Sequence, residues 1–247
     1  MSLTVTILGC SGSYPSPGEA CSGYLVRSDQ ATTVVDLGSG TLANLQRQVA
    51  LTDIDALVLT HQHPDHWMDL PILRNALRYY LNHRDLPVYG PQGVLDQAQV
   101  VIDGLEPTLR WTTIDSSSEV AIGDQRLTFS RTDHPVETLA VRLAAAGATI
   151  AYTADTGSAW DPGELLASAD LLLCEATVTE DHEDQVQHLS GRQAGALARR
   201  AGVGRLVVTH VAPGVDREGQ RAAAAAAFGG PVELAEVNHT YVASDAS

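Results

Sequence analysis

Short apolar runs recur along the chain, and each run ends in a polar or glycine-containing turn. Such runs, rich in Val, Ile, Leu and Thr, are typical of buried strands. In the first half, the pattern predicts strands at Leu3–Gly9, Tyr24–Arg27, Thr32–Asp36 and Ala56–Thr60. In the second half, it predicts strands at Gln125–Arg131, Leu139–Ala144, Thr149–Thr153, Leu171–Glu175 and Arg205–Thr209.

Stretches with helical spacing lie between these runs. One of them carries leucines about one turn apart, at Leu70, Leu73, Leu77 and Leu81. Another begins at Ser190 with the form of a capping box, and Gly202 is a typical helix stop. The pattern predicts helices at Thr41–Val49, Asp69–Leu81, Gly191–Ala201 and Arg217–Phe228. Strands and helices alternate in both halves, which favours two sheets packed face to face with helices outside.

The polar segment after one strand is rich in metal-binding side chains. It reads His61-Gln62-His63-Pro64-Asp65-His66 and directly follows the apolar run Ala56–Thr60. Imidazole nitrogen suits zinc and similar first-row cations, and a carboxylate can hold a second, harder position. Four ionisable groups beside a buried strand need a partner that stabilises them. The segment therefore predicts a paired-metal site, in preference to a polar loop that happens to be rich in histidine.

Three later strands also end in a residue that can bind a metal. These residues are His134 after Gln125–Arg131, Asp155 after Thr149–Thr153, and His210 after Arg205–Thr209. Ligands collected at one edge of a sheet can converge on one site. We therefore expect these three residues to join the four on the loop.

The pattern His-x-His-x-Asp-His, with ligands at three further strand ends, resembles the metallo-β-lactamase superfamily. The resemblance implies an α/β fold, the four-layer αββα sandwich, and two divalent metal ions. It assigns His61, His63 and His134 to one metal, Asp65, His66 and His210 to the other, and Asp155 as the bridge. Two such cations stabilise the attacking and leaving oxygens of a displacement, so the implied reaction is hydrolysis. Zinc is the expected metal, and the ligand set also accepts manganese or iron.

Several motifs resemble those of the ribonuclease Z-like phosphodiesterases within this superfamily. They are Leu8–Ser13, Val35–Gly40, Val88–Pro91, Cys174–Thr177 and His188–Ser190. Two of these motifs carry a histidine in the family, and here Cys174 replaces the first. The catalytic histidine therefore carries over to His188 alone, which joins Asp65 as a predicted catalytic residue.

His188 precedes a predicted helix start, where free N–H groups favour a phosphate. We expect His188 to steady a phosphoryl oxygen or to protonate the leaving group. A position in a surface loop is the alternative.

Composition limits the class of protein. With 247 residues and 44% hydrophobic side chains, the chain can form a single hydrolase domain over residues 1–247. No apolar run approaches the roughly 20 residues that span a bilayer, and no signal-peptide pattern opens the chain. Cys10, Cys21 and Cys174 lack metal-type spacing and fit a reducing compartment. We therefore expect a cytoplasmic enzyme with no membrane partner.

Charge and loop length narrow the substrate. The formal charge of −15 opposes binding to the phosphate backbone of nucleic acids. Ribonuclease Z grips transfer RNA with a long arm between the equivalents of His134 and Asp155, where this sequence has room only for two strands and a turn. We therefore expect no stable nucleic-acid binding and rank small phosphodiesters first, with cyclic nucleotides such as cAMP as the main candidates.

Three other functions stay open. A ribonuclease Z-like endoribonuclease would process the 3′ end of transfer RNA. A lactonase or thioester hydrolase would use the same metals on a carbonyl. A non-catalytic binding module would be expected to lose ligands, and all the predicted ones are present. The resemblance also implies a homodimer.

Finally, Arg74 and Arg78 are expected on a solvated face more than in the pocket, and Trp111 in packing more than against a base.

Overall fold

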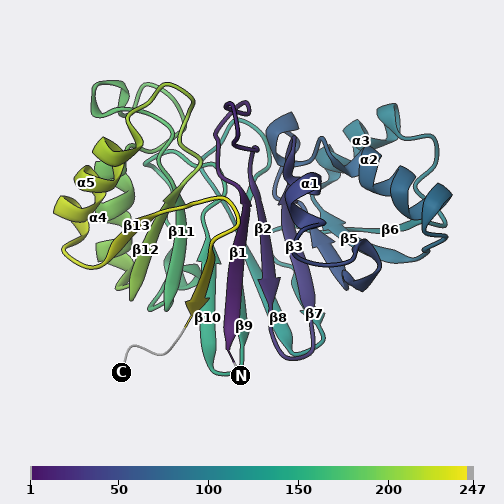
Figure 1. The fold of residues 1–247 in the computed structure, drawn as a ribbon. Coiled ribbons are helices and arrows are strands. Elements are labelled where there is room, and N and C mark those ends of the chain that lie inside the picture. The colour runs from purple at the N-terminus through teal and green to yellow at the C-terminus, as the bar shows by residue number, and fades with distance from the viewer. Residues whose placement is uncertain (1, 244–247) are drawn as a thin grey trace.

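The computed structural model describes residues 2–243, which form two seven-stranded sheets packed face to face (Figure 1). The first sheet has the order β14 (Thr240–Ala243), β1 (Leu3–Gly9), β2 (Gly23–Arg27), β3 (Thr32–Leu37), β4 (Ala56–Val58), β5 (Leu86–Gly90) and β6 (Leu109–Thr113). The second has the order β13 (Val232–Leu234), β12 (Arg205–Thr209), β11 (Leu171–Glu175), β10 (Ala148–Tyr152), β9 (Leu139–Ala145), β8 (Gln125–Arg131) and β7 (Glu119–Ile122).

Helices cover the outer face of each sheet. The first sheet carries α1 (Thr41–Leu45), α2 (Leu70–Asn75) and α3 (Gln92–Val101), and the second carries α4 (Gly191–Ala201) and α5 (Arg217–Phe228) (Figure 1). One apolar core fills the space between the sheets. A second core lies between the first sheet and its helices, and a third lies between the second sheet and its helices. The predicted αββα sandwich is therefore confirmed. None of the helices within residues 2–243 is long and apolar enough to cross a membrane.

Both sheets are parallel on one side and antiparallel on the other. Strands β3 to β6 run parallel in the first sheet, as do β10 to β13 in the second. The carboxyl ends of parallel strands lie at the same edge of a sheet. This arrangement brings the segments after β4, β10 and β12 to one end of the sandwich.

Two predicted helices are shorter in the structure. The helix predicted at Thr41–Val49 ends at Leu45. The one predicted at Asp69–Leu81 becomes α2 followed by a π-helical turn at Ala76–Tyr80. A π turn is wider than an α turn, so it shifts the spacing of the side chains. Leu81 consequently leaves the core face and is 45% exposed.

The sequence pattern missed α3 and the strands β5, β6, β7, β13 and β14. Four of them, β6, β7, β13 and β14, form the edges of the two sheets, and β5 pairs beside the edge strand β6. Edge strands bury less surface and tolerate polar side chains, as the exposed Arg110 of β6 and Glu119 of β7 illustrate. Their apolar runs are therefore too weak to be recognised.

Candidate metal centre

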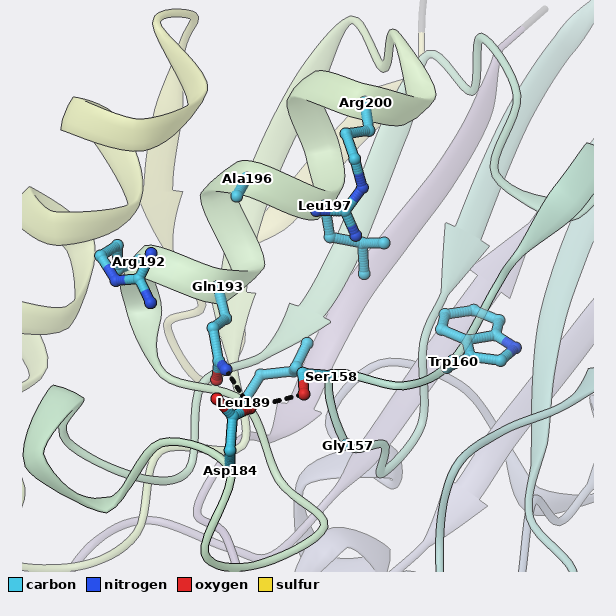
Figure 2. A pocket seen from close by; sticks show the side chains of 10 residues that line it. All are labelled: Gly157, Ser158, Trp160, Asp184, Leu189, Arg192, Gln193, Ala196, Leu197 and Arg200. Carbon is cyan, nitrogen blue, oxygen red and sulfur yellow. Dashed lines mark hydrogen bonds between the residues drawn. The ribbon is translucent and has the colours of Figure 1, made fainter.

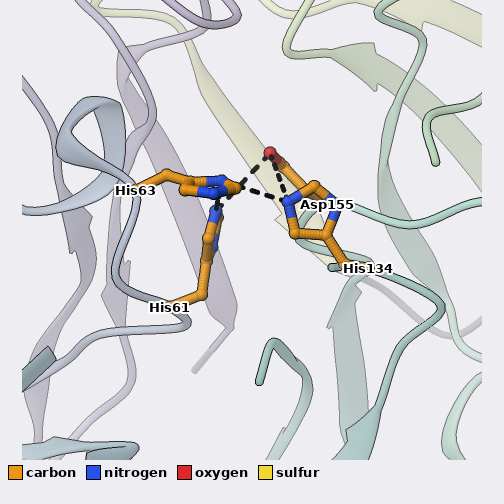
Figure 3. Close-up of side chains that lie close together, drawn as sticks. All are labelled: His61, His63, His134 and Asp155. Atoms are coloured by element: carbon orange, nitrogen blue, oxygen red, sulfur yellow. Dashed lines mark hydrogen bonds and ion pairs between the residues drawn. The ribbon is translucent and has the colours of Figure 1, made fainter. Parts of the chain in front are cut away.

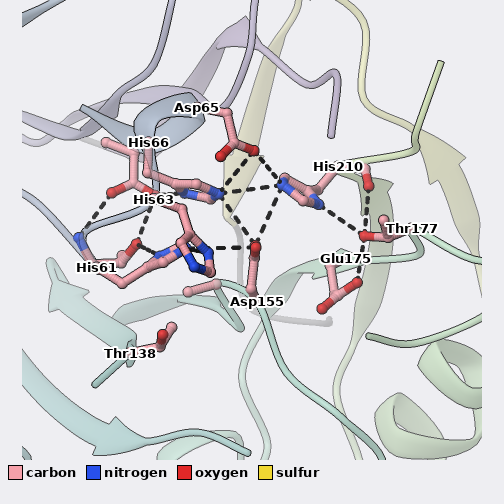
Figure 4. Close-up of polar contacts among 12 residues, drawn as sticks. His61, His63, Asp65, His66, Thr138, Asp155, Glu175, Thr177 and His210 are labelled. Atoms are coloured by element: carbon pink, nitrogen blue, oxygen red, sulfur yellow. Dashed lines mark hydrogen bonds and ion pairs between the residues drawn. The ribbon is translucent and has the colours of Figure 1, made fainter. Parts of the chain in front are cut away.

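All seven predicted ligands meet at one end of the sandwich (Figure 3 and Figure 4). Four come from the loop after β4, and three come from the segments after β8, β10 and β12. The loop turns sharply because Pro64 begins a 3₁₀ turn that ends at His66. His63 is partly buried, and the other six are buried.

The first cluster contains His61, His63, His134 and Asp155 (Figure 3). Nε2 of His61 and Nε2 of His134 each lie 3.1 Å from Nδ1 of His63. Nitrogen ligands about 2.0–2.1 Å from a tetrahedral zinc ion are roughly 3.3 Å apart. The spacing of these donor atoms therefore matches one cation held between three imidazoles.

The second cluster contains Asp65, His66 and His210. Nε2 of His210 lies 3.2 Å from Nε2 of His66 and 3.2 Å from Oδ2 of Asp65. The backbone N–H of Ser13 donates to the same Asp65 oxygen at 2.8 Å and holds the carboxylate toward the cluster. The arrangement can hold a cation with mixed nitrogen and oxygen ligands.

Asp155 lies between the two clusters. Its Oδ2 is 3.6 Å from Nε2 of His61, and its Oδ1 is 3.3 Å from Nε2 of His66 and 3.4 Å from Nε2 of His210. Oδ1 is buried and has no hydrogen-bond partner among the described residues. A buried carboxylate oxygen without a partner is costly, and a pair of cations would supply the missing interaction. The donor set thus fits two metal ions with Asp155 shared.

Hydrogen bonds on the far side of four imidazoles orient their Nε2 atoms toward the centre. Nδ1 of His134 faces the carbonyl oxygen of Gln187 at 3.2 Å, and because a carbonyl can only accept, this nitrogen carries the proton. Nδ1 of His66 contacts Oδ2 of Asp36 at 2.7 Å. Each Nε2 is then free to bind a cation, as in known metal sites.

Two threonines do the same for the remaining pair. Nδ1 of His61 contacts Oγ1 of Thr60 at 3.1 Å, and Nδ1 of His210 contacts Oγ1 of Thr177 at 2.8 Å. Each hydroxyl donates onward to a buried carboxylate, Thr60 to Asp36 and Thr177 to Glu175. The sequence reading did not assign these supporting residues. The signals that could have found them are the position of Thr60 directly before His61 and the place of the other three in the motifs Val35–Gly40 and Cys174–Thr177.

Burial and charge set opposing protonation tendencies in the two clusters. Burial holds the pKa of His61 well below its usual value, which favours the neutral ring that a metal needs. Burial also lowers the pKa of His66, but the carboxylates of Asp155 and Asp36 outweigh it and raise that pKa. The second cluster therefore has a surplus of negative charge, which attracts cations.

His188 lies beside the clusters and contacts Glu175. Its Nδ1 is 3.0 Å from Oε1 of Glu175, and a ring nitrogen lies within 4.8 Å of ligand atoms of Asp155 and His210. Burial lowers the pKa of His188, but the Glu175 carboxylate raises it to about 9. The side chain is 20% exposed, so it can meet both the clusters and an entering substrate.

The start of α4 is held firmly beside the centre. Ser190 and Gln193 form the predicted capping box, and Gly202 ends the helix. Figure 2 shows a pocket lined by residues of this helix, in which Asp184 accepts hydrogen bonds from Ser158 and Gln193 at 2.6 and 3.0 Å. These bonds connect the segment after Asp155 to the segment that carries His188.

Close backbone packing also shapes the site. A Cβ on Gly38 would lie 1.9 Å from the carbonyl oxygen of Asp65, so only glycine fits there. His210 has φ 52° and Ala154 has φ 50°, values that are uncommon for residues with a side chain. Such strain is characteristic of positions that a surrounding structure holds for function.

Other sequence candidates lie elsewhere. Arg74 is buried at 3% exposure and donates to the carbonyl oxygen of Gly104, so it belongs to neither the pocket nor a solvated face. Arg78 is exposed. Trp111 packs against the core beneath α3, as expected. His182 and His239 are exposed.

Comparison with known proteins identifies the family. A model of the β-lactamase superfamily domain matches residues 32–211. An uncharacterised protein of Mycobacterium tuberculosis is 34% identical, covering 98% of this chain and 92% of its own length. Ribonuclease Z of Methanopyrus kandleri is 30% identical, covering 92% of this chain and 93% of its own length.

A probable metallo-hydrolase, YhfI of Bacillus subtilis, is similar in both sequence and structure. Its sequence is 31% identical and covers 95% of this chain and 97% of its own length. Its crystal structure matches with a TM-score of 0.91 and 29% identity, covering 98% of this chain and 100% of that chain. With its fold, its His and Asp clusters and these relatives, the chain belongs to the β-lactamase superfamily and is one of its metallo-hydrolases.

Proposed function

We propose that this hydrolase cleaves small phosphodiesters, with cyclic nucleotides such as cAMP first among them. The observation that carries the proposal is the pair of adjoining clusters that share Asp155. Two divalent cations supply Lewis acidity and activate water when bound, which is the use that phosphatases and nucleases make of such pairs. We propose zinc for both positions, with manganese or iron as alternatives, because His and Asp donors accept all three.

The chain's own residues would divide the work as follows. Asp155 and Asp65 would help to hold the cations through the negative charge of their carboxylates. His188, protonated and held by Glu175, would donate its proton to the leaving oxygen. The same group could instead stabilise the phosphoryl oxygens as a fixed positive charge.

The short segment between His134 and Asp155 supports the proposal that the substrate is small. It consists of β9, β10 and a turn at Ala146 and Gly147, with no protruding arm. The charge of −15 adds long-range repulsion of a polyanion, whereas the cations would dominate the field close to the site. Relatives named ribonuclease Z keep transfer-RNA processing as the second candidate.

A substrate panel tests the proposal. Metal-loaded protein should turn over cAMP or bis-p-nitrophenyl phosphate far faster than it cleaves precursor transfer RNA. This difference should persist at low salt, where attraction to nucleic acid is strongest. Efficient 3′ processing of the precursor would overturn the ranking. Faster turnover of an acyl-homoserine lactone or a thioester would move the reaction to a carbonyl. Cation binding without turnover of any of these would favour a binding module.

We also propose a cytoplasmic homodimer in which residues 1–247 act as one domain. The three cysteines are buried and free, which suits a reducing compartment. Ile72, Tyr79 and Tyr80 expose apolar surface on the helical stretch after the metal loop. Light scattering of the purified protein measures the oligomeric state, and a monomeric mass would refute the dimer.

A further inference from the structure

Strand β10 reaches the metal ligand His66 in two ways. Asp155, just beyond the end of this strand, lies 3.3 Å from Nε2 of His66 through its Oδ1. Tyr152, its last residue, donates its hydroxyl to Oδ2 of Asp36 at 3.2 Å, and the same oxygen lies 2.7 Å from Nδ1 of His66. Both ring nitrogens of His66 are therefore linked to β10. Nε2 faces Asp155, which follows this strand, and Nδ1 contacts Asp36, which accepts a hydrogen bond from Tyr152 of the same strand.

We propose that Tyr152 is a positioning residue that fixes His66 through Asp36 and thereby sets the affinity of the second cation. The proposal rests on the assignment of that cation to Asp65, His66 and His210 in the proposed function. Tyr152 would act without touching the metal or the substrate.

The position of Asp36 supports this role. Asp36, the last residue but one of β3, is completely buried in the first sheet, whereas Tyr152 belongs to the second sheet. The other donors to its carboxylate are His66 and the backbone and hydroxyl of Thr60, all from the first sheet. Tyr152 thus provides the contact to this carboxylate that crosses between the sheets. With φ 57°, Asp36 leaves the strand conformation and directs its side chain into this network.

Through this network, Tyr152 should affect the position of His66 in the second cluster more strongly than the position of His61 in the first cluster. His66 contacts Asp36 itself, whereas His61 reaches Asp36 only through Thr60. Burial raises the pKa of Tyr152 above its usual value, so the hydroxyl stays a neutral donor. A buried carboxylate that loses a donor is less well fixed, and so is the imidazole that it orients.

Tyr24 provides a matched control. Its ring centroid lies 4.6 Å from that of Tyr152, both rings are fully buried, and its hydroxyl pairs with Oγ1 of Thr209 at 2.8 Å. Tyr24→Phe removes a hydroxyl from the same core and leaves the bonds to Asp36 intact. A merely structural role of Tyr152 would make the two substitutions equivalent.

The test measures zinc affinity by competition with a chromophoric chelator, one cluster at a time. A His63→Ala background leaves only the second cluster complete, and an Asp65→Ala background leaves only the first. In the first of these backgrounds, Tyr152→Phe should weaken zinc binding roughly 10–100-fold, the usual cost of losing an outer partner. In the second background, the loss should be smaller by at least about threefold, because the effect passes through one more hydrogen bond. Tyr24→Phe should leave both affinities unchanged.

In the otherwise native chain, kcat of Tyr152→Phe should recover as zinc is added, while the melting temperatures of the two metal-free variants should fall by similar amounts. Equal zinc affinities for the Phe variants would overturn the positioning role and leave the phosphodiesterase proposal standing. A His63→Ala protein that binds no zinc would remove the second site itself, and the inference with it. Turnover of cAMP by the native chain is a separate measurement and tests the proposed function alone.

Discussion

The two sheets contribute to the metal centre in different ways. The first sheet provides four predicted ligands from one loop after β4, within the short segment from His61 to His66. The second provides one ligand at each of three strand ends, His134, Asp155 and His210. The supporting contacts differ correspondingly. Asp36 is the common support of two imidazoles in the loop, whereas His134 and His210 have separate partners in Gln187 and Thr177.

This contrast indicates how each half tolerates change. In the loop, Asp36 supports ligands of both clusters, because His61 belongs to the first cluster and His66 belongs to the second. In the second sheet, a substitution should act on one cluster, except at Asp155. Substitutions chosen from the two halves can therefore separate shared from independent support.

Asp155→Ala should have the largest effect. Each cation loses a ligand, so zinc content should fall at both positions and kcat/KM should fall by more than about 10³-fold, beyond the roughly 10–100-fold cost of outer partners. Elemental analysis and turnover of bis-p-nitrophenyl phosphate measure both quantities. Asp133→Asn is the control, since Asp133 belongs to neither cluster and accepts from Ala159 and Gln187. Native protein that never exceeds one zinc per chain would refute the bridge.

His188→Ala should lower kcat without loss of metal. The expected decrease is about 10²–10⁴-fold, the range for a positioned acid or base. The decrease should shrink for p-nitrophenyl esters, whose leaving group departs as a stable anion. Loss of zinc would instead make His188 a ligand, and an unchanged kcat on a poor leaving group would return it to a surface role. An equal decrease in kcat on both kinds of substrate would mean that His188 stabilises the phosphoryl oxygens and does not protonate the leaving group.

The contrast between the sheets also explains what the sequence could predict. The ligands of the first sheet form one contiguous motif, so residue spacing alone indicates a metal site. Those of the second sheet are single residues, and they were located because each follows an apolar strand and matches the family order. The structure brings all of these residues together, as expected, at one end of the predicted αββα sandwich. The assignment of each to a given cation stays a prediction.

The supporting residues could not be predicted in the same way. Asp36 contacts His66 from a left-handed backbone conformation near the end of β3, and Tyr152 reaches Asp36 only because two sheets pack together. Neither relation leaves a local pattern, since the partners are far apart in the chain. The same holds for Arg74, whose burial depends on the carbonyl oxygens of Asp103 and Gly104 after α3.

Glu175→Gln should have an intermediate effect, roughly 10–100-fold on kcat. Burial lowers the pKa of His188 and Glu175 raises it, so removal of the negative charge should lower this pKa. His188 is protonated below its pKa, and its activity as a proton donor is lost as the pH rises through that pKa. The alkaline limb of the kcat profile should therefore move to lower pH in the variant. A lower kcat with an unmoved limb would mean that Glu175 supports His210 through Thr177 and does not set the charge of His188.

The smallest effects should come from a matched pair of hydroxyls, one from each half. Thr60 and Thr177 each lie between Nδ1 of a ligand imidazole and a buried carboxylate. Replacement by valine keeps the shape and removes the hydrogen bonds, which should cost about tenfold in zinc affinity. Thr177→Val should weaken only the second cation, because His210 belongs to that cluster alone. Thr60→Val should weaken the first cation most and the second slightly, since Asp36 also orients His66. Chelator competition in the single-cluster backgrounds measures both. If Thr60→Val affects one cluster and Thr177→Val affects both, the shared support lies in the second sheet and the comparison is reversed.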